Sequence, residues 1–535
     1  METEVLIIGG GATGLGLAWD LALRGVHTVL IEQGDFGHGT STRFHGLLHS
    51  GGRYAVKDPV SAQECIQENM TLKRVAAPCI EDTGGWFVHL TTDDPDYPGR
   101  WVTACRKTGI PVQERPVQEV LDLVPALNPA IDQAFFVPDA AINGFRLLHA
   151  LAYSARQRGV RLMTYTRAVS LVQKGGRVVG AVTVDHRSGQ RQEIRASLIV
   201  NTSGPWAAEV AAMAGIRVGM RLDKGSLLIF NHRLSGQVIN RLRSPGDADI
   251  LVPAGTVSIL GTTSVPVESP DNPIPSAGEL LHMLALGEEL FPHLHDYRVI
   301  RAFAGVRPLY DPAEGQGSAG REVSRTFSLL DHAVRDGLEG LVSVVGGKLT
   351  TFRLMAEKTG DLVVQKLGVG ASSKTAITPL SLPERRPVSV FMPAKGRGDI
   401  KSQASGIRDV KESNQTYRLP DNVICECEAV SLGDLHAALA EAPDGDLNDL
   451  RRRTRLGMGT CQGSFCSFRS AAALCQSGEF SVERANVMLQ QLVQERWKGV
   501  RPVLWGEQLR EAEFMQAIYK RLLNLARLDA GGERV

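Results

Sequence analysis

An uninterrupted run of apolar residues opens the chain. Residues 5–8 are all hydrophobic, as expected of a strand that is buried on both faces of a parallel sheet. A glycine-rich turn follows, then a helix that runs to about Arg24 and stops at Gly25, a residue type that ends many helices. A second apolar strand covers 26–31 and ends at Glu32. The pattern predicts a strand–turn–helix–strand unit at the N-terminus.

Four further segments show a regular pattern of apolar positions. Residues 198–210 predict a buried strand, a glycine-containing turn and a helix. Residues 59–75 predict a helix whose N-terminus carries a capping box formed by Ser61 and Glu64. Residues 487–500 and 506–528 have helical periodicity. The last helix is amphipathic, which suits packing on its own domain and, less often, docking to another protein chain or a membrane surface.

The turn after the first strand carries a nucleotide-binding motif. Gly9, Gly11 and Gly14 fit G-x-G-x-x-G, and Glu32 follows at the distance at which a carboxylate accepts hydrogen bonds from ribose. Because the motif lies between a predicted strand and a predicted helix, it predicts dinucleotide binding at the helix N-terminus. Residues 315–320 match the bare spacing, but the chain shows no second strand–turn–helix unit that carries the motif. We therefore expect FAD that collects electrons directly from a substrate, without bound NAD.

Length, charge and cysteine content narrow the class of protein. The chain has 535 residues, so we expect roughly two to four domains. A net charge of +1 argues against binding of bulk nucleic acid. The sequence has no apolar run of membrane-spanning length and no secretory signal pattern, so a cytoplasmic protein is expected. Eight cysteines in a cytoplasmic chain do not suggest a disulfide framework.

Several longer motifs resemble a known family. GGGATG, STRFHGLLHSGGRYAV, KGSLLIF, GVRPL and GGKLTTFRLMAE resemble the FAD-dependent glycerol-3-phosphate dehydrogenases, which belong to the D-amino-acid-oxidase-like flavoproteins. The distal cysteines, spaced C-x-C and C-x4-C, and the segment ERWKGVRPVLWGEQLREAEF resemble the A subunits of the anaerobic type. The similarity covers nearly the whole chain.

The resemblance implies an α/β fold with three parts. A flavoprotein body over 1–375 would hold a discontinuous, Rossmann-like FAD domain (about 1–75, 140–215 and 325–370). An α+β substrate cap (about 76–139 and 216–324) would be built on an antiparallel sheet. The Pro- and Gly-rich stretch 376–419 reads as a linker. A small helical [2Fe–2S] domain of the bacterioferritin-associated-ferredoxin type would cover 420–480, and C-terminal helices 481–535.

The resemblance also implies a reaction. The family oxidises sn-glycerol 3-phosphate to dihydroxyacetone phosphate by hydride transfer to FAD. Electrons then pass through the [2Fe–2S] cluster to partner subunits of the B and C type and to membrane quinone, with the enzyme peripheral on the inner face of the membrane. A FAD-dependent dehydrogenase or oxidase of a hydroxy or amino acid is an open alternative, because arginine also binds carboxylate. A redox scaffold or sensor without a substrate is a third.

A phosphorylated substrate needs cationic side chains. Arg53, Arg307 and Lys348 lie in glycine-rich or strand-end motifs and match the family's substrate positions, with Arg325 and Tyr54 as further candidates. His49 or Lys348 is the candidate catalytic base. Aerobic relatives often carry His after Lys-Gly-Ser, where this chain has Leu227, so the assignment of the base stays open.

The family also implies a set of FAD contacts. The expected residues are Gly9, Gly11, Ala12, Thr13, Gly14, Glu32, Gln33, Thr40, Ser41, Thr42, His45, Gly46, Leu47, Val169, Gly204, Trp206, Gly347, Leu349 and Thr350. For Val169, a buried strand position is an equally good interpretation. After Gly347, Thr350 or Thr351 is expected to cap a helix whose positive N-terminal end faces the flavin.

Four cysteines near the C-terminus suggest a metal site. Cys425, Cys427, Cys461 and Cys466 supply the four thiolates that a [2Fe–2S] cluster needs, two for each iron. Zinc is the main alternative, although C-x-C is tight for a zinc knuckle. Thiols without metal, such as a redox disulfide between Cys461 and Cys466, are a third. The remaining cysteines, Cys65, Cys79, Cys105 and Cys475, are expected to be ordinary buried residues.

Overall fold

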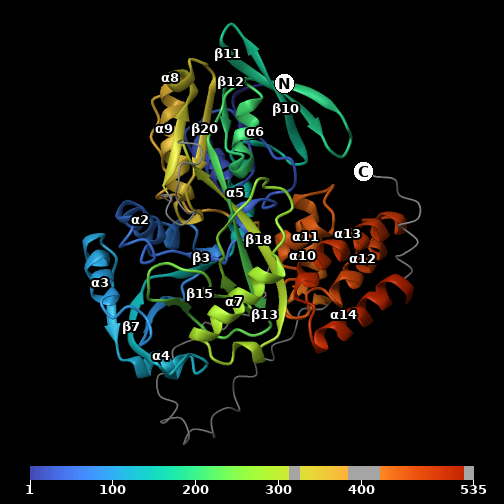
Figure 1. The fold of residues 1–535 in the computed structure, drawn as a ribbon. Helices are drawn as coiled ribbons and strands as arrows, with labels where there is room; N and C mark the ends of the chain where they lie inside the picture. The colour runs from blue at the N-terminus through green and yellow to red at the C-terminus, as the bar shows by residue number, and fades with distance from the viewer. Residues whose placement is uncertain (313–325, 384–421, 523–535) are drawn as a thin grey trace, which may run out of the picture.

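The computed structural model describes residues 1–312, 326–383 and 422–522 (Figure 1). An eight-stranded sheet and a nine-stranded sheet form the body, and the helices of the C-terminal part lie together on one side of it (Figure 1). The long strand β18 (Val299–Tyr310) runs between these parts. The body therefore has the predicted α/β architecture, with two large sheets and a helical C-terminal part.

The eight-stranded sheet contains the predicted N-terminal unit. Its main path runs β10-β11-β12-β1-β2-β9, and β20 joins β19 to β12. The strands are β1 (Glu2–Ile8), β2 (Thr28–Ile31), β9 (Arg161–Met163), β10 (Thr166–Lys174), β11 (Arg177–Asp185), β12 (Arg191–Asn201), β19 (Phe327–Asp331) and β20 (Leu341–Gly346). Strands β2 and β12 pair with β1 in parallel, with Ile8 opposite both Ile31 and Asn201. The carboxyl ends of these three strands therefore meet at one edge, where ligands bind in open α/β sheets.

Helices cover both faces of this sheet. The helices α1 (Ala12–Leu23), α5 (Gly144–Arg156) and α9 (Phe352–Leu367) pack on one face, and α6 (Ala207–Ala212) packs on the other. The first helix ends as predicted, with Gly25 in the left-handed region at φ +78°. The second strand is shorter than the apolar run suggests, because it begins at Thr28.

The predicted start of helix α2 (Pro59–Val75) is wrong in one detail. Asp58, not Ser61, is the N-cap, and its carboxylate accepts hydrogen bonds from the Ser61 backbone N–H at 3.1 Å and from Ser61 Oγ at 2.7 Å. Pro59 explains the difference, because its fixed φ suits the first helical position, so the cap lies three residues before Ser61.

The nine-stranded sheet runs β17-β13-β16-β15-β14-β5-β7-β6, with β18 on the other side of β13. Its strands are β5 (Gly85–Leu90), β6 (Gln113–Arg115), β7 (Ile131–Val137), β13 (Met220–Phe230), β14 (Val238–Arg241), β15 (Ile250–Ala254), β16 (Val257–Gly261), β17 (Val265–Pro266) and β18. All pairs are antiparallel except β14 with β5. The β13–β18 ladder places Asp223 opposite Arg307. Helices α4 (Val117–Leu123) and α7 (Ala277–Leu290) close the core below the sheet.

Smaller elements complete the body. The short strands β3 (Leu47–Leu48), β8 (Ala140–Ile142) and β4 (Ile80–Glu81) form a three-stranded sheet. Helix α3 (Tyr97–Lys107) packs through Trp101 on Phe87 and Phe135 of the nine-stranded sheet. Helix α8 (His332–Asp336) links β19 to β20.

The C-terminal part, which we call the cysteine module (residues 422–522), has a core of its own. It contains β21 (Val423–Cys425), β22 (Val430–Ser431), α10 (Leu432–Glu441), α11 (Leu447–Thr454), α12 (Cys466–Gln476), α13 (Val482–Val500) and α14 (Glu507–Ala517). Met515 packs α14 against this core, while Leu509 and Phe514 are exposed. Val503, by contrast, is buried in the core of the nine-stranded sheet. No helix in the described ranges is long and apolar enough to cross a membrane.

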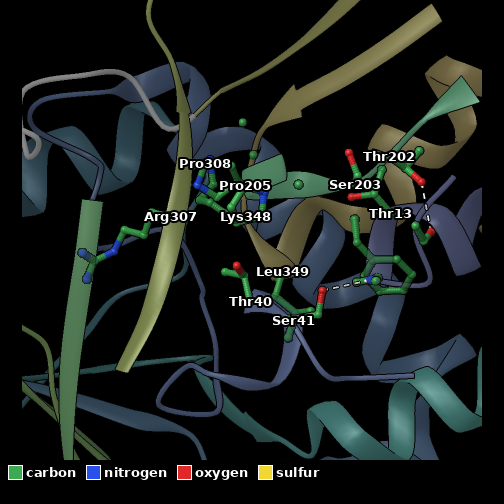
Figure 2. A pocket seen from close by; sticks show the side chains of 18 of the residues that line it. Thr13, Thr40, Ser41, Thr202, Ser203, Pro205, Arg307, Pro308, Lys348 and Leu349 are labelled. Atoms are coloured by element: carbon green, nitrogen blue, oxygen red, sulfur yellow. Dashed lines mark hydrogen bonds between the residues drawn. The ribbon is translucent and has the colours of Figure 1, made fainter. Parts of the chain in front are cut away.

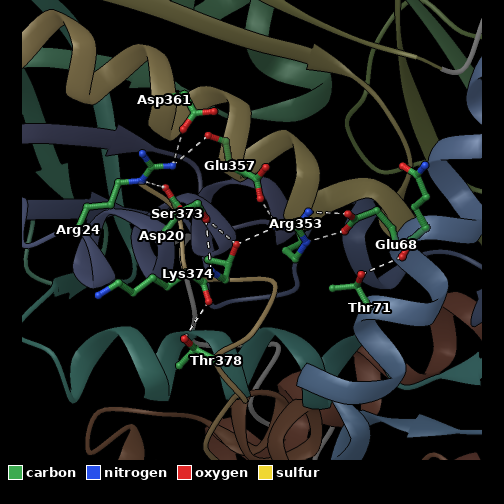
Figure 3. Close-up of polar contacts among 12 residues, drawn as sticks. Asp20, Arg24, Glu68, Thr71, Arg353, Glu357, Asp361, Ser373, Lys374 and Thr378 are labelled. Carbon is green, nitrogen blue, oxygen red and sulfur yellow. Dashed lines mark hydrogen bonds and ion pairs between the residues drawn. The ribbon is translucent and has the colours of Figure 1, made fainter. Parts of the chain in front are cut away.

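Hydrogen bonds to ion-paired residues of the body hold residues 371–375 in place (Figure 3). Arg24 donates to Asp20 at 2.6 Å and to Asp361 at 2.8 Å, and Ser373 Oγ donates to Asp20. Arg353 holds Glu68 of α2 through two hydrogen bonds, at 2.6 and 2.8 Å. Of the expected linker 376–419, only residues 376–383 lie in the described part of the chain.

Candidate active site

A cavity of about 880 Å³ opens at the carboxyl edge of the eight-stranded sheet. The turn after β1, the end of β2, the loop 37–54, the turn after β12, the start of α9 and strand β18 all contribute to its wall. Figure 2 shows Thr13 and Thr202 toward one end and Arg307, Pro308 and Lys348 toward the other. A volume of this order suits a large cofactor together with a small substrate.

The nucleotide end of the cavity is built by the glycine motif. A Cβ at Gly14 would lie 1.9 Å from the carbonyl oxygen of Gly9, so only glycine allows the helix to approach the strand this closely. Glu32 is held in place by two backbone donors, Gly10 N–H at 2.7 Å and Gly34 N–H at 2.9 Å. Burial raises the pKa of Glu32, and these N–H bonds oppose the shift. Each of its oxygens keeps a further lone pair that can accept from a ribose hydroxyl.

Most of the residues expected to contact FAD line this cavity. They are Gly9, Gly11, Ala12, Thr13, Glu32, Gln33, Thr40, Ser41, His45, Leu47, Gly204, Trp206, Gly347, Leu349 and Thr350. Thr42, Gly46, Gly14 and Val169 are not part of the wall. Val169 is 38% exposed, and its neighbour Ala168 takes the lining position. Val169 is therefore neither part of the cavity wall nor a buried strand residue.

The cavity wall also contains two arginines, Arg53 and Arg307, that are fixed by buried carboxylates. Arg307 Nη1 donates to Asp223 at 2.6 Å, and its Nη2 donates to the Thr263 carbonyl at 3.1 Å. Arg53 Nη2 donates to Asp249 at 3.1 Å and to the Gly246 carbonyl at 2.8 Å. A Cβ at Gly225 would lie 2.5 Å from Arg307 Nη2, so glycine makes room for the guanidinium. The sequence did not indicate either carboxylate, because each is far from its arginine along the chain and reaches it only in the folded protein.

Lys348, Tyr54, His45 and His49 also line the cavity. Lys348 Nζ lies 3.0 Å from Ser61 Oγ and 5.2 Å from the centre of the Tyr54 ring. The His49 ring is 5.3 Å from the Tyr54 ring and 5.6 Å from the His45 ring. Of the substrate candidates, Arg325 lies outside the described residues.

Both histidines are neutral in this environment. Burial and the nearby Arg53 and Arg307 lower the pKa of His45 to about 3. Burial, with His45 and Arg53, lowers the pKa of His49 well below its ordinary value. His45 Nδ1 accepts the Leu47 backbone N–H at 3.1 Å, which also requires the unprotonated nitrogen. A neutral imidazole at His49 can accept a proton, as a general base must.

The turn before α9 matches the predicted cap. Gly346 and Gly347 both have positive φ, and a short 3-10 turn over Leu349–Thr351 leads into the helix with Thr351 at its N-cap. Gly347, Leu349 and Thr350 line the cavity, so the N-terminal end of α9 faces it. The positive end of a helix stabilises negative charge there.

The four distal cysteines come together in the cysteine module. Cys425 Sγ lies 3.7 Å from Cys427 Sγ, which lies 3.8 Å from Cys461 Sγ, and Cys466 contacts Cys425. Backbone N–H groups of Gly457, Gly463 and Ser464 point at the sulfurs. A Cβ at Gly459 would lie 2.7 Å from Cys427 Sγ, so glycine is needed beside the thiols.

This donor set fits a [2Fe–2S] cluster. Such a cluster needs two thiolates on each iron, and N–H groups near the sulfurs stabilise its negative charge. Of the other cysteines, Cys65, Cys79 and Cys105 are buried as predicted, whereas Cys475 is partly exposed.

Comparison with known protein families defines the class. Residues 4–353 match the family of FAD-dependent oxidoreductases, and residues 423–472 match the BFD-like [2Fe-2S]-binding domain. The fold is also similar to a solved glycerol-3-phosphate dehydrogenase from Bacillus halodurans in complex with FAD, with a TM-score of 0.62 and 21% identity over 95% of this chain and 97% of that one. Fold and site together define a FAD-dependent oxidoreductase that carries an iron–sulfur module.

Closer relatives narrow the family. The A subunit of the anaerobic glycerol-3-phosphate dehydrogenase of Escherichia coli is 41% identical over 98% of this chain and 97% of the relative. The A1 subunit of the Haloferax volcanii enzyme is 42% identical over 97% of this chain and 90% of the relative. The chain therefore belongs to the family of anaerobic glycerol-3-phosphate dehydrogenase A subunits, as the sequence motifs predicted.

Proposed function

We propose that this protein oxidises sn-glycerol 3-phosphate to dihydroxyacetone phosphate. The observation that carries the proposal is the pair Arg53 and Arg307, which line the FAD cavity and are each fixed by a buried carboxylate. A phosphate dianion loses its water shell on entry and needs charged donors that are already oriented. The names of the relatives support glycerol 3-phosphate as the substrate.

The residues of this chain have separate tasks in the reaction. Arg53, Arg307 and Lys348 bind the phosphate and orient the two free hydroxyl groups, and Tyr54 covers the substrate on the His49 side. His49, as a neutral imidazole, accepts the proton of the C2 hydroxyl. FAD supplies the acceptor for the hydride that leaves C2. The residues of the glycine motif, Glu32 and the turn before α9 hold this cofactor.

Two electrons must leave after each turnover. Cys425, Cys427, Cys461 and Cys466 would hold a [2Fe–2S] cluster, which would supply one-electron transfer. The E. coli relative is named as one subunit of its enzyme, which supports an assembly of several subunits here. We infer that electrons continue through partner subunits of the B and C type to membrane quinone. The protein would then work in the cytoplasm at the inner face of the membrane.

The expected domain division stays a prediction within this proposal. The body over 1–375, the linker 376–419, the [2Fe–2S] domain 420–480 and the helical region 481–535 each have a task. Within the body, the two large sheets support the division into a FAD domain and a substrate cap. One sheet takes its strands from 2–31, 161–201 and 327–346, and the other takes them from 85–137 and 220–310.

An anaerobic titration tests the reaction. Purified protein is mixed with sn-glycerol 3-phosphate, with lactate or with D-alanine, and the flavin absorbance and the EPR signal of reduced iron are followed. We expect glycerol 3-phosphate alone to bleach the flavin and to produce the EPR signal. Bleaching by lactate or D-alanine but not by glycerol 3-phosphate would replace the proposal with an oxidase or dehydrogenase of hydroxy or amino acids. Bound FAD that none of the three reduces would indicate a scaffold or sensor.

A further inference from the structure

Helix α11 of the cysteine module is joined to the body by a buried set of charges, which we call the docking lock. Its members are Asp35, Tyr165 and Arg187 of the body and Asp449, Arg452 and Arg453 of α11.

The centre of the docking lock is a two-pronged pair. Arg453 donates to both oxygens of Asp35, at 2.7 and 2.9 Å, and Arg452 Nε donates to the same carboxylate at 3.0 Å. The side chains of Asp35 and Arg453 are only 2% and 4% exposed. Burial alone would raise the pKa of Asp35, but the two guanidinium groups, Arg453 first, hold it well below its usual range. A buried pair of this kind is costly to break from one side.

A second set of contacts joins α11 to the loop that contains Tyr165. Tyr165 donates its hydroxyl to Asp449 at 2.5 Å, and Arg187 donates to the other oxygen of Asp449 at 3.1 Å. The guanidinium of Arg187 also stacks on the Tyr165 ring at 3.5 Å. Tyr165 has φ +56°, which is uncommon for a residue with a side chain, so its loop is held in a special conformation.

The loops that contain Asp35 and Tyr165 both lie next to Glu32. Tyr165 N–H donates to the Gly34 carbonyl at 2.9 Å, and Thr166 N–H donates to the Glu32 carbonyl at 2.8 Å. Glu32 and Thr166 both line the cavity at its nucleotide end. Asp35 is therefore three residues from Glu32, the carboxylate expected to bind ribose. The docking lock contacts the loops that form this part of the cavity wall from the side away from the cavity.

We propose that Asp35 and Arg453 are positioning residues that couple the docking of the cysteine module to the binding of FAD. A docked α11 holds loops 33–35 and 164–166 in the shape that accepts the nucleotide. Bound FAD in turn fixes the same loops for α11, because linkage between two sites is reciprocal. The proposal rests on the proposed function only in taking FAD as the cofactor.

Titration of FAD into FAD-free protein provides the first test. Asp35→Asn and Arg453→Gln should each raise the dissociation constant of FAD about tenfold, a typical coupling between sites. The double variant should bind FAD as tightly as the single variant with the lower affinity, because both changes remove the same contact. Arg453→Lys, which keeps the charge but loses the fork, should lie between wild type and Arg453→Gln; it is also the variant to use if Arg453→Gln fails to fold.

A matched control separates coupling from lost stability. Arg241 forms a pair of similar geometry with Asp93, at 2.8 Å on both prongs and with side chains 4% and 8% exposed, in the nine-stranded sheet. Arg241→Gln should lower the unfolding temperature as Arg453→Gln does, yet leave the dissociation constant of FAD unchanged. An equal loss of FAD affinity in both variants would overturn the proposal, and so would additive effects in the double variant.

Hydrogen exchange tests the opposite direction without any substrate. In wild type, removal of FAD should speed exchange of the α11 amides (447–454), and adding FAD should slow it again. In Asp35→Asn, exchange should be fast in both states. Wild-type α11 exchange that is indifferent to FAD would refute the coupling. Because neither test uses glycerol 3-phosphate, a wrong substrate assignment would leave both results intact.

Discussion

Arg307 reaches the substrate end of the cavity with its orientation already set. Asp223 and the Thr263 carbonyl hold two of its nitrogens, and a glycine, Gly225, leaves space for the guanidinium. A charged donor that is fixed before binding loses little entropy when the phosphate arrives. The same holds for Arg53 through Asp249.

Arg307→Gln should therefore weaken substrate use without loss of FAD. A hydrogen bond to a charged group contributes about 1.5–3 kcal/mol, so kcat/KM for glycerol 3-phosphate should fall roughly 10- to 100-fold. Steady-state kinetics with an artificial acceptor measures it, and the flavin-to-protein absorbance ratio checks cofactor content. Arg233→Gln, which breaks an ion pair with Glu81 away from the cavity wall, is the control and should match wild type. An unchanged kcat/KM in Arg307→Gln would remove this residue from the site.

His45 should make stability depend on pH. Its pKa is about 3 in the fold and about 6.5 in an unfolded chain. The unfolded chain therefore binds the proton first, and the contribution of neutral His45 is present above pH 6.5 and lost as pH falls below it. Between pH 7 and pH 5 the fold should lose at most about 2 kcal/mol from this residue.

Thermal unfolding at pH 7 and pH 5 checks this expectation. In His45→Asn, which keeps an acceptor for the Leu47 N–H, the difference between the two pH values should be smaller than in wild type. Equal differences in the two proteins would show that His45 does not carry the effect.

At the scale of single elements, the glycine motif decides whether FAD can bind. Gly14 and Gly99 both occupy the third position of a helix, in α1 and α3. A Cβ at Gly14 would lie 1.9 Å from the Gly9 carbonyl oxygen, whereas a Cβ at Gly99 would meet nothing within 4 Å. Gly14→Ala must therefore push the helix away from the strand.

Gly14→Ala is expected to purify with less than about a tenth of the wild-type FAD, because the helix N-terminus no longer reaches the pyrophosphate. Gly99→Ala should keep its FAD and gain up to about 1 kcal/mol of stability. The absorbance ratio at 450 and 280 nm reports the first effect, and thermal unfolding the second. Full flavin content in Gly14→Ala would show that the close approach is not required.

Elements whose signals are local could be predicted from the sequence. The first strand, the glycine turn and Glu32 follow one another within the first 32 residues, so apolar runs and spacing were sufficient. The N-cap of α2 was misassigned because Asp58 and Ser61 are both good caps and only the backbone conformation decides between them. Asp223 and Asp249 could not be assigned, because each is more than 80 positions from its arginine and no local pattern indicates such a partner.

At the scale of the whole molecule, the parts were predictable and their contacts were not. Family motifs indicate a flavoprotein body and an iron–sulfur module. The docking lock joins Asp35 to residues more than 400 positions away, and no local pattern specifies such a pair. The same is true of the network in Figure 3, where Arg353 of α9 holds Glu68 of α2.

Val503 gives the architecture a practical consequence. It enters the core of the nine-stranded sheet from the far end of the chain, and nearby the guanidinium of Arg301 lies against the backbone of Gly499. A chain truncated before the cysteine module would expose the apolar surface that Val503 covers and the Arg301 side chain that packs on Gly499. To study the flavin chemistry alone, the four distal cysteines should be substituted and the cysteine module kept, because Val503 of this module completes the core of the nine-stranded sheet.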